Sequence, residues 1–205
     1  MTRVGILLSG RGSNFLALHA AMASGQVPAE VALVVSNVAD APGLVKAREL
    51  GLPAVALPHR GEPDRRAHEA KVDAALRAAG VEWVCLAGYM RLLSPGFVAA
   101  WPWRILNIHP SLLPAFPGVD AQAQALAHGV KVTGCTVHFV DAGLDSGPIV
   151  VQRTVPVLDG DTARSLSARI LEQEHEAYPE ALRRLLAEPW RVEGRRLTFG
   201  EASEE

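Results

Sequence analysis

Short apolar runs alternate with helix-like segments along the first hundred residues of the chain. The runs show no alternation of apolar and polar positions, which is typical of strands covered on both faces in a parallel sheet. They cover Arg3–Leu8, Ala32–Asn37, Pro53–Leu57 and Trp83–Ala87, and helical spacing covers 15–22, 41–50 and 65–79. This order predicts a Rossmann-like α/β fold, with a twisted, mostly parallel sheet flanked by helices and joined by right-handed crossovers.

The second half of the chain combines β runs with one long helical segment. The first of its β runs alternates in part, and the two together indicate an antiparallel hairpin. The long helix contains Pro179, which predicts a break or bend there because proline has no N–H to donate. The elements expected are a central strand at 104–109, a helix at 121–128, β runs at 131–140 and 147–155, the long helix at 163–186, a short hairpin at 190–199 and a frayed end at 200–205.

Composition narrows the class of protein. The 205 residues contain no repeat, linker or charge block that would divide them, so we expect a single α/β domain. A formal net charge of -2 gives no electrostatic footprint for nucleic acid or an anionic membrane. The N-terminal apolar run is too short for a secretory signal or a membrane span. Cys85 and Cys135 lie in apolar runs, as buried reduced thiols do, so we predict a cytoplasmic protein.

The strongest chemical signal is at the end of the central strand. Asn107 and His109 are separated by one residue, so in a strand they project from the same face. Carboxyl ends of parallel strands are where α/β proteins bind ligands. A carboxamide donor beside an imidazole suits a developing oxyanion and a moving proton. The alternative is a polar turn with a structural histidine.

Two loops add weaker signals. The turn Ser9-Gly10-Arg11-Gly12-Ser13-Asn14 connects the first strand to a helix that Ser13 or Asn14 can cap, and a helix amino terminus favours a phosphate. It lacks the Gly-Lys-Ser/Thr ending of a Walker loop, and a purely structural turn is the alternative. The loop Asp141–Pro148 gathers two carboxylates and two glycines in eight residues, where the alternative is a solvated hairpin turn.

Taken together, these segments resemble the folate-dependent formyltransferases, over nearly the whole chain. The motifs that carry the resemblance are Ser9-Gly10-x-Gly12-Ser13-Asn14, Ala87-Gly88-Tyr89-Met90-Arg91, Leu106 to Pro114 with Phe116-Pro117-Gly118, Gly134 to Val140, Asp145-Ser146-Gly147-Pro148 and Gln173-Glu174-His175. The resemblance implies the formyltransferase fold, with a phosphate-binding half at 1–100, a catalytic and folate-binding half at 101–189 and a tail at 190–205.

The resemblance also implies an activity and a catalytic set. In this family the amine of 5-phosphoribosylglycinamide attacks the formyl carbon of 10-formyltetrahydrofolate, in de novo purine synthesis. Asn107 would then donate a hydrogen bond to the adduct oxygen, His109 would transfer the proton, and Asp145 would orient the imidazole. Such a transfer needs positioning, an oxyanion partner and a proton relay, and no metal.

Binding residues follow from the same resemblance. For the ribonucleotide they are Gly12, Ser13, Asn14, Leu171 and Glu174; for the folate they are Arg65, Met90, Arg91, Leu92, Leu93 and Asn107, and the loop residues Asp141, Ala142, Gly143, Leu144 and Asp145. Leu171 is apolar where relatives can carry a polar side chain. The expected partners are small-molecule substrates, without nucleic acid or membrane, for a monomer or homodimer.

Several other functions are open at this stage. A formyltetrahydrofolate deformylase would use the same three side chains with water as acceptor, but those relatives have an extra domain in front. The tRNA formyltransferases carry a C-terminal nucleic-acid-binding domain, whereas about fifteen residues follow Pro189 here. From other classes, His109, His138 and Asp145 could ligate a catalytic zinc, or the chain could be a non-catalytic nucleotide-binding module.

Overall fold

The computed structural model describes residues 1–200, and the last five positions of the predicted tail lie outside them. The chain divides into two compact units, residues 1–107 and the part from residue 108 onward. Strand β5 (Ile105–His109) contains the boundary. The predicted fold class is confirmed, because the sheet is mostly parallel and flanked by helices, with an antiparallel pair in the C-terminal half. The single-domain organisation stays a prediction.

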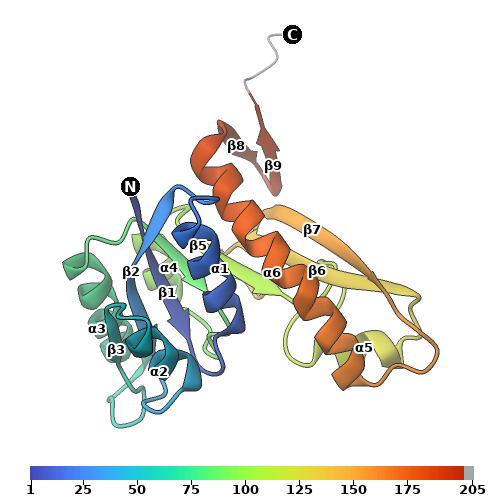
Figure 1. Cartoon of the computed structure of the whole chain (residues 1–205), viewed down its shortest axis with the longest axis horizontal. Helices are drawn as coiled ribbons and strands as arrows, with labels where there is room; N and C mark the ends of the chain where they lie inside the picture. Colours follow the sequence, from blue (N-terminus) through green and yellow to red (C-terminus); the bar gives the residue numbers. More distant parts are fainter. Residues whose placement is uncertain (201–205) are drawn as a thin grey trace. The chain divides into compact units, whose positions relative to one another are not determined.

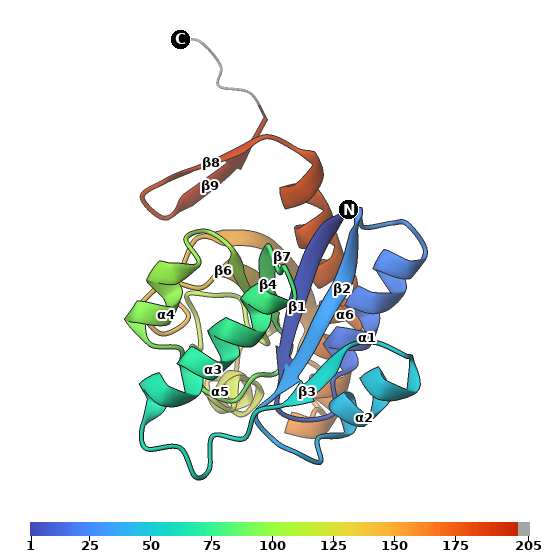
Figure 2. The same cartoon turned by 90° about the vertical axis from the view of Figure 1, so that its left-hand side faces the viewer.

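The first unit is built on parallel strands in the order β3-β2-β1-β4-β5. Helices α1 and α2 lie on one side of this sheet, and α3 and α4 lie on the other (Figures 1 and 2). The strands are β1 (Thr2–Leu8), β2 (Ala29–Ser36), β3 (Ala54–Ala56) and β4 (Trp83–Leu86), and the helices are α1 (Ser13–Ala23), α2 (Pro42–Glu49), α3 (Arg65–Ala78) and α4 (Pro95–Ala100).

Apolar runs form these strands because both of their faces are covered. Ile6, Leu7 and Leu8 of β1 and Val34 of β2 are fully buried, as expected for a parallel sheet between two helical layers. Because the strands are parallel, their carboxyl ends lie at the same edge of the sheet. The segments after β1, β2, β3 and β4 meet at this edge.

The start of α1 differs from the prediction. Neither Ser13 nor Asn14 is the N-cap of the helix: the N-cap is Gly12, in the left-handed conformation with φ 74°, which makes no side-chain capping bond. Gly12 also lies against Gly43, whose Cα would be 2.9 Å from a Cβ added there. The sequence therefore places a glycine where both the backbone angle and the packing require one.

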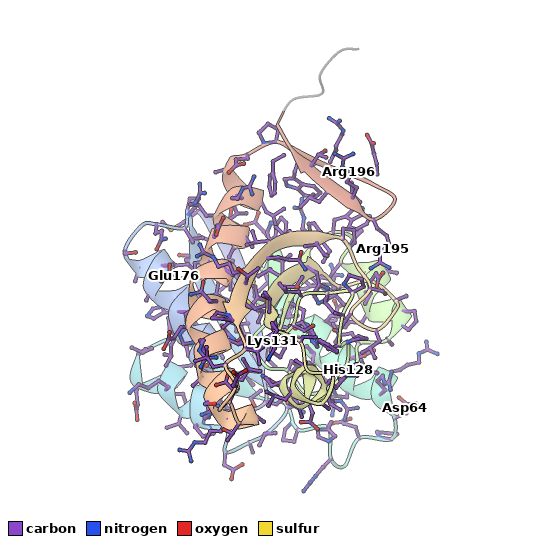
Figure 3. The ribbon with its side chains drawn as sticks, turned by 90° about the vertical axis from the view of Figure 1, so that its right-hand side faces the viewer. Asp64, His128, Lys131, Glu176, Arg195 and Arg196 are labelled. Atoms are coloured by element: carbon purple, nitrogen blue, oxygen red, sulfur yellow. The ribbon has the colours of Figure 1, made fainter. Side chains whose placement is uncertain are left out.

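The second unit pairs β6 (Val132–Phe139) with β7 (Ile149–Pro156) in antiparallel register. Helix α6 (Ala163–Ala187) packs against both strands, and α5 (Ala121–Ala127) packs against α6. A separate hairpin, β8 (Trp190–Glu193) with β9 (Arg196–Phe199), follows. Figure 3 shows Glu176 pointing outward from α6, and Arg195 and Arg196 at the hairpin turn.

Helix α6 is not broken at Pro179, so the break allowed by the sequence is wrong, and a bend there stays a prediction. It runs without interruption from Ala163 to Ala187, and Pro179 is buried within it. A proline removes one hydrogen bond of the helix, whereas α6 buries a long apolar face that includes Ile170, Tyr178 and Leu182. Packing of that face outweighs the loss of the single bond.

Both cysteines are free and buried, as predicted. Burial raises the pKa of Cys135 to about 12, and the nearby Glu174 carboxylate adds to that rise, so the thiol stays protonated. Of the helices within residues 1–200, none has both the length and the apolar character needed to cross a bilayer.

Candidate functional site

His109 and Asp145 lie together in the second unit. His109 ends β5, and its Nδ1 atom is 3.5 Å from Asp145 Oδ2, with both side chains nearly buried. The other carboxylate oxygen of Asp145 is 3.8 Å from Nε2 of His138. Burial lowers the pKa of His138, so this second histidine stays neutral beside the pair. The imidazole and carboxylate separated by 36 positions in sequence are thus brought together.

The turn after β5 fixes this pair from the other side. Phe116 O lies 2.8 Å from His109 Nε2, and Gly118 N donates to Asp145 Oδ2 at 2.8 Å. Phe116 and Asp145 both adopt left-handed backbone angles, with φ 53° and 49°. Such angles are unfavourable for residues with a Cβ and persist only where the surrounding contacts hold them. Both ring nitrogens of His109 therefore face oxygen atoms in a tightly defined geometry.

Thr136 holds the turn between His109 and Pro114. Its buried hydroxyl donates to Ser111 O at 2.7 Å and accepts from Leu113 N at 3.0 Å. Gln152 on β7 donates to Thr136 Oγ1 at 3.0 Å and to Leu113 O at 2.9 Å. Sequence reasoning assigned no role to Thr136, although it lies in the segment Gly134 to Val140, or to Gln152, because both act through contacts with a distant turn.

The loop from Asp141 to Asp145 is closed by its own side chains. Asp141 Oδ1 accepts hydrogen bonds from Gly143 N at 3.0 Å and from Ser146 Oγ at 2.7 Å. A Cβ at Gly147 would lie 1.8 Å from Phe139 O, so the chain can pass there only with glycine. The loop therefore has a defined shape, with Ala142, Gly143 and Leu144 exposed.

Glu174 and Leu171 lie one turn apart on α6, so they share a face of the helix. The Glu174 side chain is buried, with 7% of its surface exposed. Its neighbour His175 has a pKa lowered by burial. Burying a carboxylate on an otherwise apolar helix face costs desolvation free energy. Glu174 is therefore a candidate for ligand binding.

In the first unit, the predicted phosphate turn connects β1 to α1. Gly12 caps the helix without a side-chain bond, so the amide groups of the first helical turn receive no oxygen from a capping side chain. Gly43 N donates to Gly10 O at 2.9 Å and holds the turn against α2. Amide groups at a helix amino terminus attract anions. The geometry suits a phosphate at Gly12, Ser13 and Asn14.

The segment Met90–Leu93 lies beyond β4, and two of its apolar side chains are exposed. Met90 is 74% exposed and Leu92 is 60% exposed, which is unusual for large apolar side chains and typical of a ligand surface. Burial raises the pKa of the preceding Tyr89 to about 12; the charge of Arg91 opposes this rise and that of Glu69 adds to it. Glu69 is buried and accepts hydrogen bonds from both Ser94 N, at 2.8 Å, and Ser94 Oγ.

Two predicted residues of the first unit remain, Arg65 and Asn107. Arg65 begins α3 and is exposed, and Asn107 lies two positions before His109 on β5, on the same strand face. Within residues 1–200, no three histidine, cysteine, aspartate or glutamate side chains form a group that could hold a metal ion. The described residues therefore give the zinc alternative no support.

An imidazole and a carboxylate held together after a strand of an α/β sheet, as His109 and Asp145 are, suit an enzyme that moves a proton during group transfer. Comparison with known proteins identifies the family. The sequence matches the family described as formyl transferase over residues 2–182. This chain therefore belongs to the formyl transferase family.

Individual relatives agree. The chain is 39% identical over 186 residues to a phosphoribosylglycinamide formyltransferase of Bacillus subtilis, covering 91% of this chain and 95% of the relative. It is 47% identical over 182 residues to a trifunctional purine biosynthetic protein adenosine-3 of Drosophila pseudoobscura, covering 88% of this chain. The chain spans only 13% of the length of that relative.

Solved structures show the same fold. A glycinamide ribonucleotide transformylase 1 from Symbiobacterium toebii has a TM-score of 0.96 and 52% identity, covering 98% of this chain and 95% of that chain. A formyltetrahydrofolate deformylase from Pseudomonas syringae has a TM-score of 0.89 but only 27% identity, and 66% of its chain is covered. Similarity to the deformylase is therefore lower in sequence than in fold.

Proposed function

We propose that this chain transfers the formyl group of 10-formyltetrahydrofolate to the amine of 5-phosphoribosylglycinamide. The observation that carries the proposal is the contact of His109 with Asp145 in a chain whose relatives are named for this activity. The products would be formylglycinamide ribonucleotide and tetrahydrofolate, in purine biosynthesis. Both substrates are small molecules.

The proposed reaction forms one C–N bond and breaks another. The substrate amine attacks the formyl carbon, the tetrahedral adduct collapses, and N10 of the folate leaves with a proton in exchange for one lost by the amine. The carboxamide of Asn107 stabilises the adduct oxygen by donating a hydrogen bond. His109 transfers the proton, and Asp145 holds the ring in the productive orientation.

We assign the ribonucleotide to two segments. Its phosphate binds at the amino terminus of α1, where Gly12, Ser13 and Asn14 lie and where no side chain caps the helix. Glu174 on α6 binds the ribose or the amine, and the neighbouring position 171 contributes apolar contact through Leu171. The negative charge of the substrate phosphate would interact favourably with the positive end of the α1 helix dipole.

We assign the folate to three segments. The backbone of Met90, Arg91, Leu92 and Leu93 binds the polar edge of the pterin, with the exposed apolar side chains against its ring. The loop from Asp141 to Asp145 adds a backbone surface of defined shape, because Asp141 Oδ1 accepts hydrogen bonds from within the loop and from Ser146. Arg65 binds the carboxylates of the folate tail.

An absorbance assay for tetrahydrofolate formation tests the proposed function. With 10-formyltetrahydrofolate and 5-phosphoribosylglycinamide together, product should form at a rate that falls to background when the acceptor is left out. Equal rates with and without acceptor would identify a deformylase instead. No folate product in either case would favour a binding module. Metal analysis of the purified protein addresses the zinc hydrolase directly. Cytoplasmic location and a monomeric or dimeric state stay predictions.

A further inference from the structure

A chain of hydrogen bonds crosses the carboxyl ends of four neighbouring strands in the first unit. Ser9, directly after β1, donates from Oγ to Asn37 Oδ1, directly after β2. Asn37 Nδ2 lies 3.2 Å from Nδ1 of His59, beyond β3. Met90 N, beyond β4, donates to Ser9 Oγ at 2.8 Å. The chain therefore ends on the first residue of the proposed pterin-binding segment.

The direction of each bond follows from the chemistry of the groups. A backbone N–H can only donate, so Ser9 Oγ accepts from Met90 and its own proton goes to the Asn37 carbonyl oxygen. The Asn37 amide nitrogen then points at the ring of His59, whose Nδ1 accepts. Asn37 is 5% exposed, so this orientation is held away from competing water.

Ser9 contacts the segment after β4 at two points. Its backbone N–H donates to Gly88 O at 3.0 Å, and its side chain accepts from Met90 N. These bonds fix the backbone on both sides of Tyr89. The side chains of Met90 and Leu92 are largely exposed, so packing contributes little to the position of this segment. Hydrogen bonds at its ends, from Ser9 here and Glu69 at Ser94, must hold it.

We propose that Ser9 is a positioning residue for the formyl donor. Its hydroxyl, oriented by Asn37 and His59, holds the Met90 amide so that the backbone from Met90 to Leu93 is preformed for the pterin. This inference rests on the proposed function for the identity of the ligand. It gives Ser9 and Asn37 a role in folate binding. The place of Ser9 in the predicted phosphate turn does not indicate this role.

The variant Ser9→Ala tests the proposal, with Ser36→Ala as its matched control. Ser36 is also a serine at the end of a neighbouring strand and is fully buried, but among residues 1–200 its hydroxyl bonds only to Val38 N and O. Ser9→Ala should raise the Michaelis constant for 10-formyltetrahydrofolate roughly fivefold, the effect of one hydrogen bond. The Michaelis constant for the ribonucleotide and kcat at saturation should change less than about twofold. Ser9→Thr, which keeps the hydroxyl, should restore the wild-type value.

Amide hydrogen exchange at Met90, without ligands, separates this inference from the proposed function. Ser9→Ala should make the Met90 amide exchange roughly fivefold faster or more, while Ser36→Ala should leave it unchanged. This readout holds even if the wild-type protein transfers no formyl group. Unchanged exchange, or equal rises of both Michaelis constants in Ser9→Ala and Ser36→Ala, would overturn the positioning role. Asn37→Ala should reproduce the effect of Ser9→Ala, and Asn37→Asp, which keeps an acceptor for Ser9, should give a smaller one.

Discussion

The two units hold their candidate binding segments in different ways. In the first unit, Ser9 and Asn37 directly follow parallel strands, and hydrogen bonds connect them to each other and to Met90, beyond β4, across the sheet edge. In the second unit, Asp145 lies in a loop with a left-handed backbone, and its contact with His109 is supported by the turn at Phe116 and Gly118. Left-handed angles at non-glycine residues cost about 1–3 kcal/mol each.

This difference predicts how strongly a single substitution in each unit affects activity. A sheet edge positions its segments through many strands at once, so loss of one bond shifts a segment only slightly. A strained turn depends on the few bonds that close it, so loss of one bond releases the stored strain. We therefore expect larger losses of activity from single substitutions around the His109–Asp145 pair than from substitutions at the sheet edge.

Asp145→Asn should have the largest effect. The amide keeps the size of the side chain but removes the charge and one acceptor beside His109 Nδ1, so kcat should fall roughly 100- to 10,000-fold. Binding of 5-phosphoribosylglycinamide, measured by calorimetry, should change little. Asp159→Asn is the control, since that carboxylate is 95% exposed and pairs only with Lys131 among residues 1–200. If Asp145→Asn keeps full turnover, the assigned proton relay is wrong.

Thr136→Val tests the turn that follows His109. Valine has the shape of threonine but leaves Ser111 O and Leu113 N without their buried partner, so the free energy of unfolding should fall by about 2–4 kcal/mol. The turnover should fall with it, because the same turn supports His109. Urea denaturation and kcat measured on one preparation give both quantities.

Thr133→Val is the matched control for that substitution. Thr133 lies on the same strand and is equally buried, yet its hydroxyl has no hydrogen-bond partner within residues 1–200. Removing an unsatisfied buried hydroxyl should leave stability unchanged or raise it by about 1 kcal/mol. Equal losses in Thr133→Val and Thr136→Val would show that the turn does not depend on the Thr136 hydroxyl.

The same contrast explains how much the sequence could predict. Continuous apolar runs predicted the strands of the first unit, because burial on both faces leaves a local pattern. The spacing of Asn107 and His109 predicted their common face, because strand geometry is local too. The fold class was predicted correctly on this basis, and the family was predicted correctly from the resemblance that the motifs carry.

The rest depends on contacts between distant positions. Thr136 meets Leu113 across 23 positions, and Met90 meets Ser9 across 81, so no periodicity reveals either bond. The cap of α1 was predicted wrongly because Ser13 and Asn14 match the usual preference, whereas the close approach of Gly43 imposes a left-handed glycine at Gly12. A break at Pro179 does not occur either, because packing of α6 outweighs a local preference.

Gly12→Ala probes the sheet edge of the first unit. A Cβ there meets the Gly43 backbone at 2.9 Å and the backbone angle is left-handed, so we expect a loss of roughly 2–3 kcal/mol in unfolding free energy. Gly51→Ala is the control, because Gly51 has nearly the same angle but an added Cβ has nothing within 4 Å, and it should lose only about 1 kcal/mol. Calorimetric melting of both variants measures the difference. The ribonucleotide Michaelis constant should rise in Gly12→Ala alone, and an equal rise in Gly51→Ala would argue against a phosphate site at the turn.

The pH dependence of stability gives the smallest and finest test of the second unit. Burial lowers the pKa of His138 below its usual 6.5, so between the two values the unfolded chain binds a proton that the folded chain does not. Above pH 6.5, His138 therefore does not lower the free energy of unfolding. As the pH falls below this value, the free energy of unfolding decreases by at most about 1.4 kcal/mol per pH unit. Urea midpoints of the wild type should fall from pH 7 toward pH 5, and His138→Asn should show a flatter profile. A variant profile parallel to that of the wild type would mean that His138 has the same pKa in the folded and unfolded chains, which would contradict a neutral ring held beside Asp145 by burial.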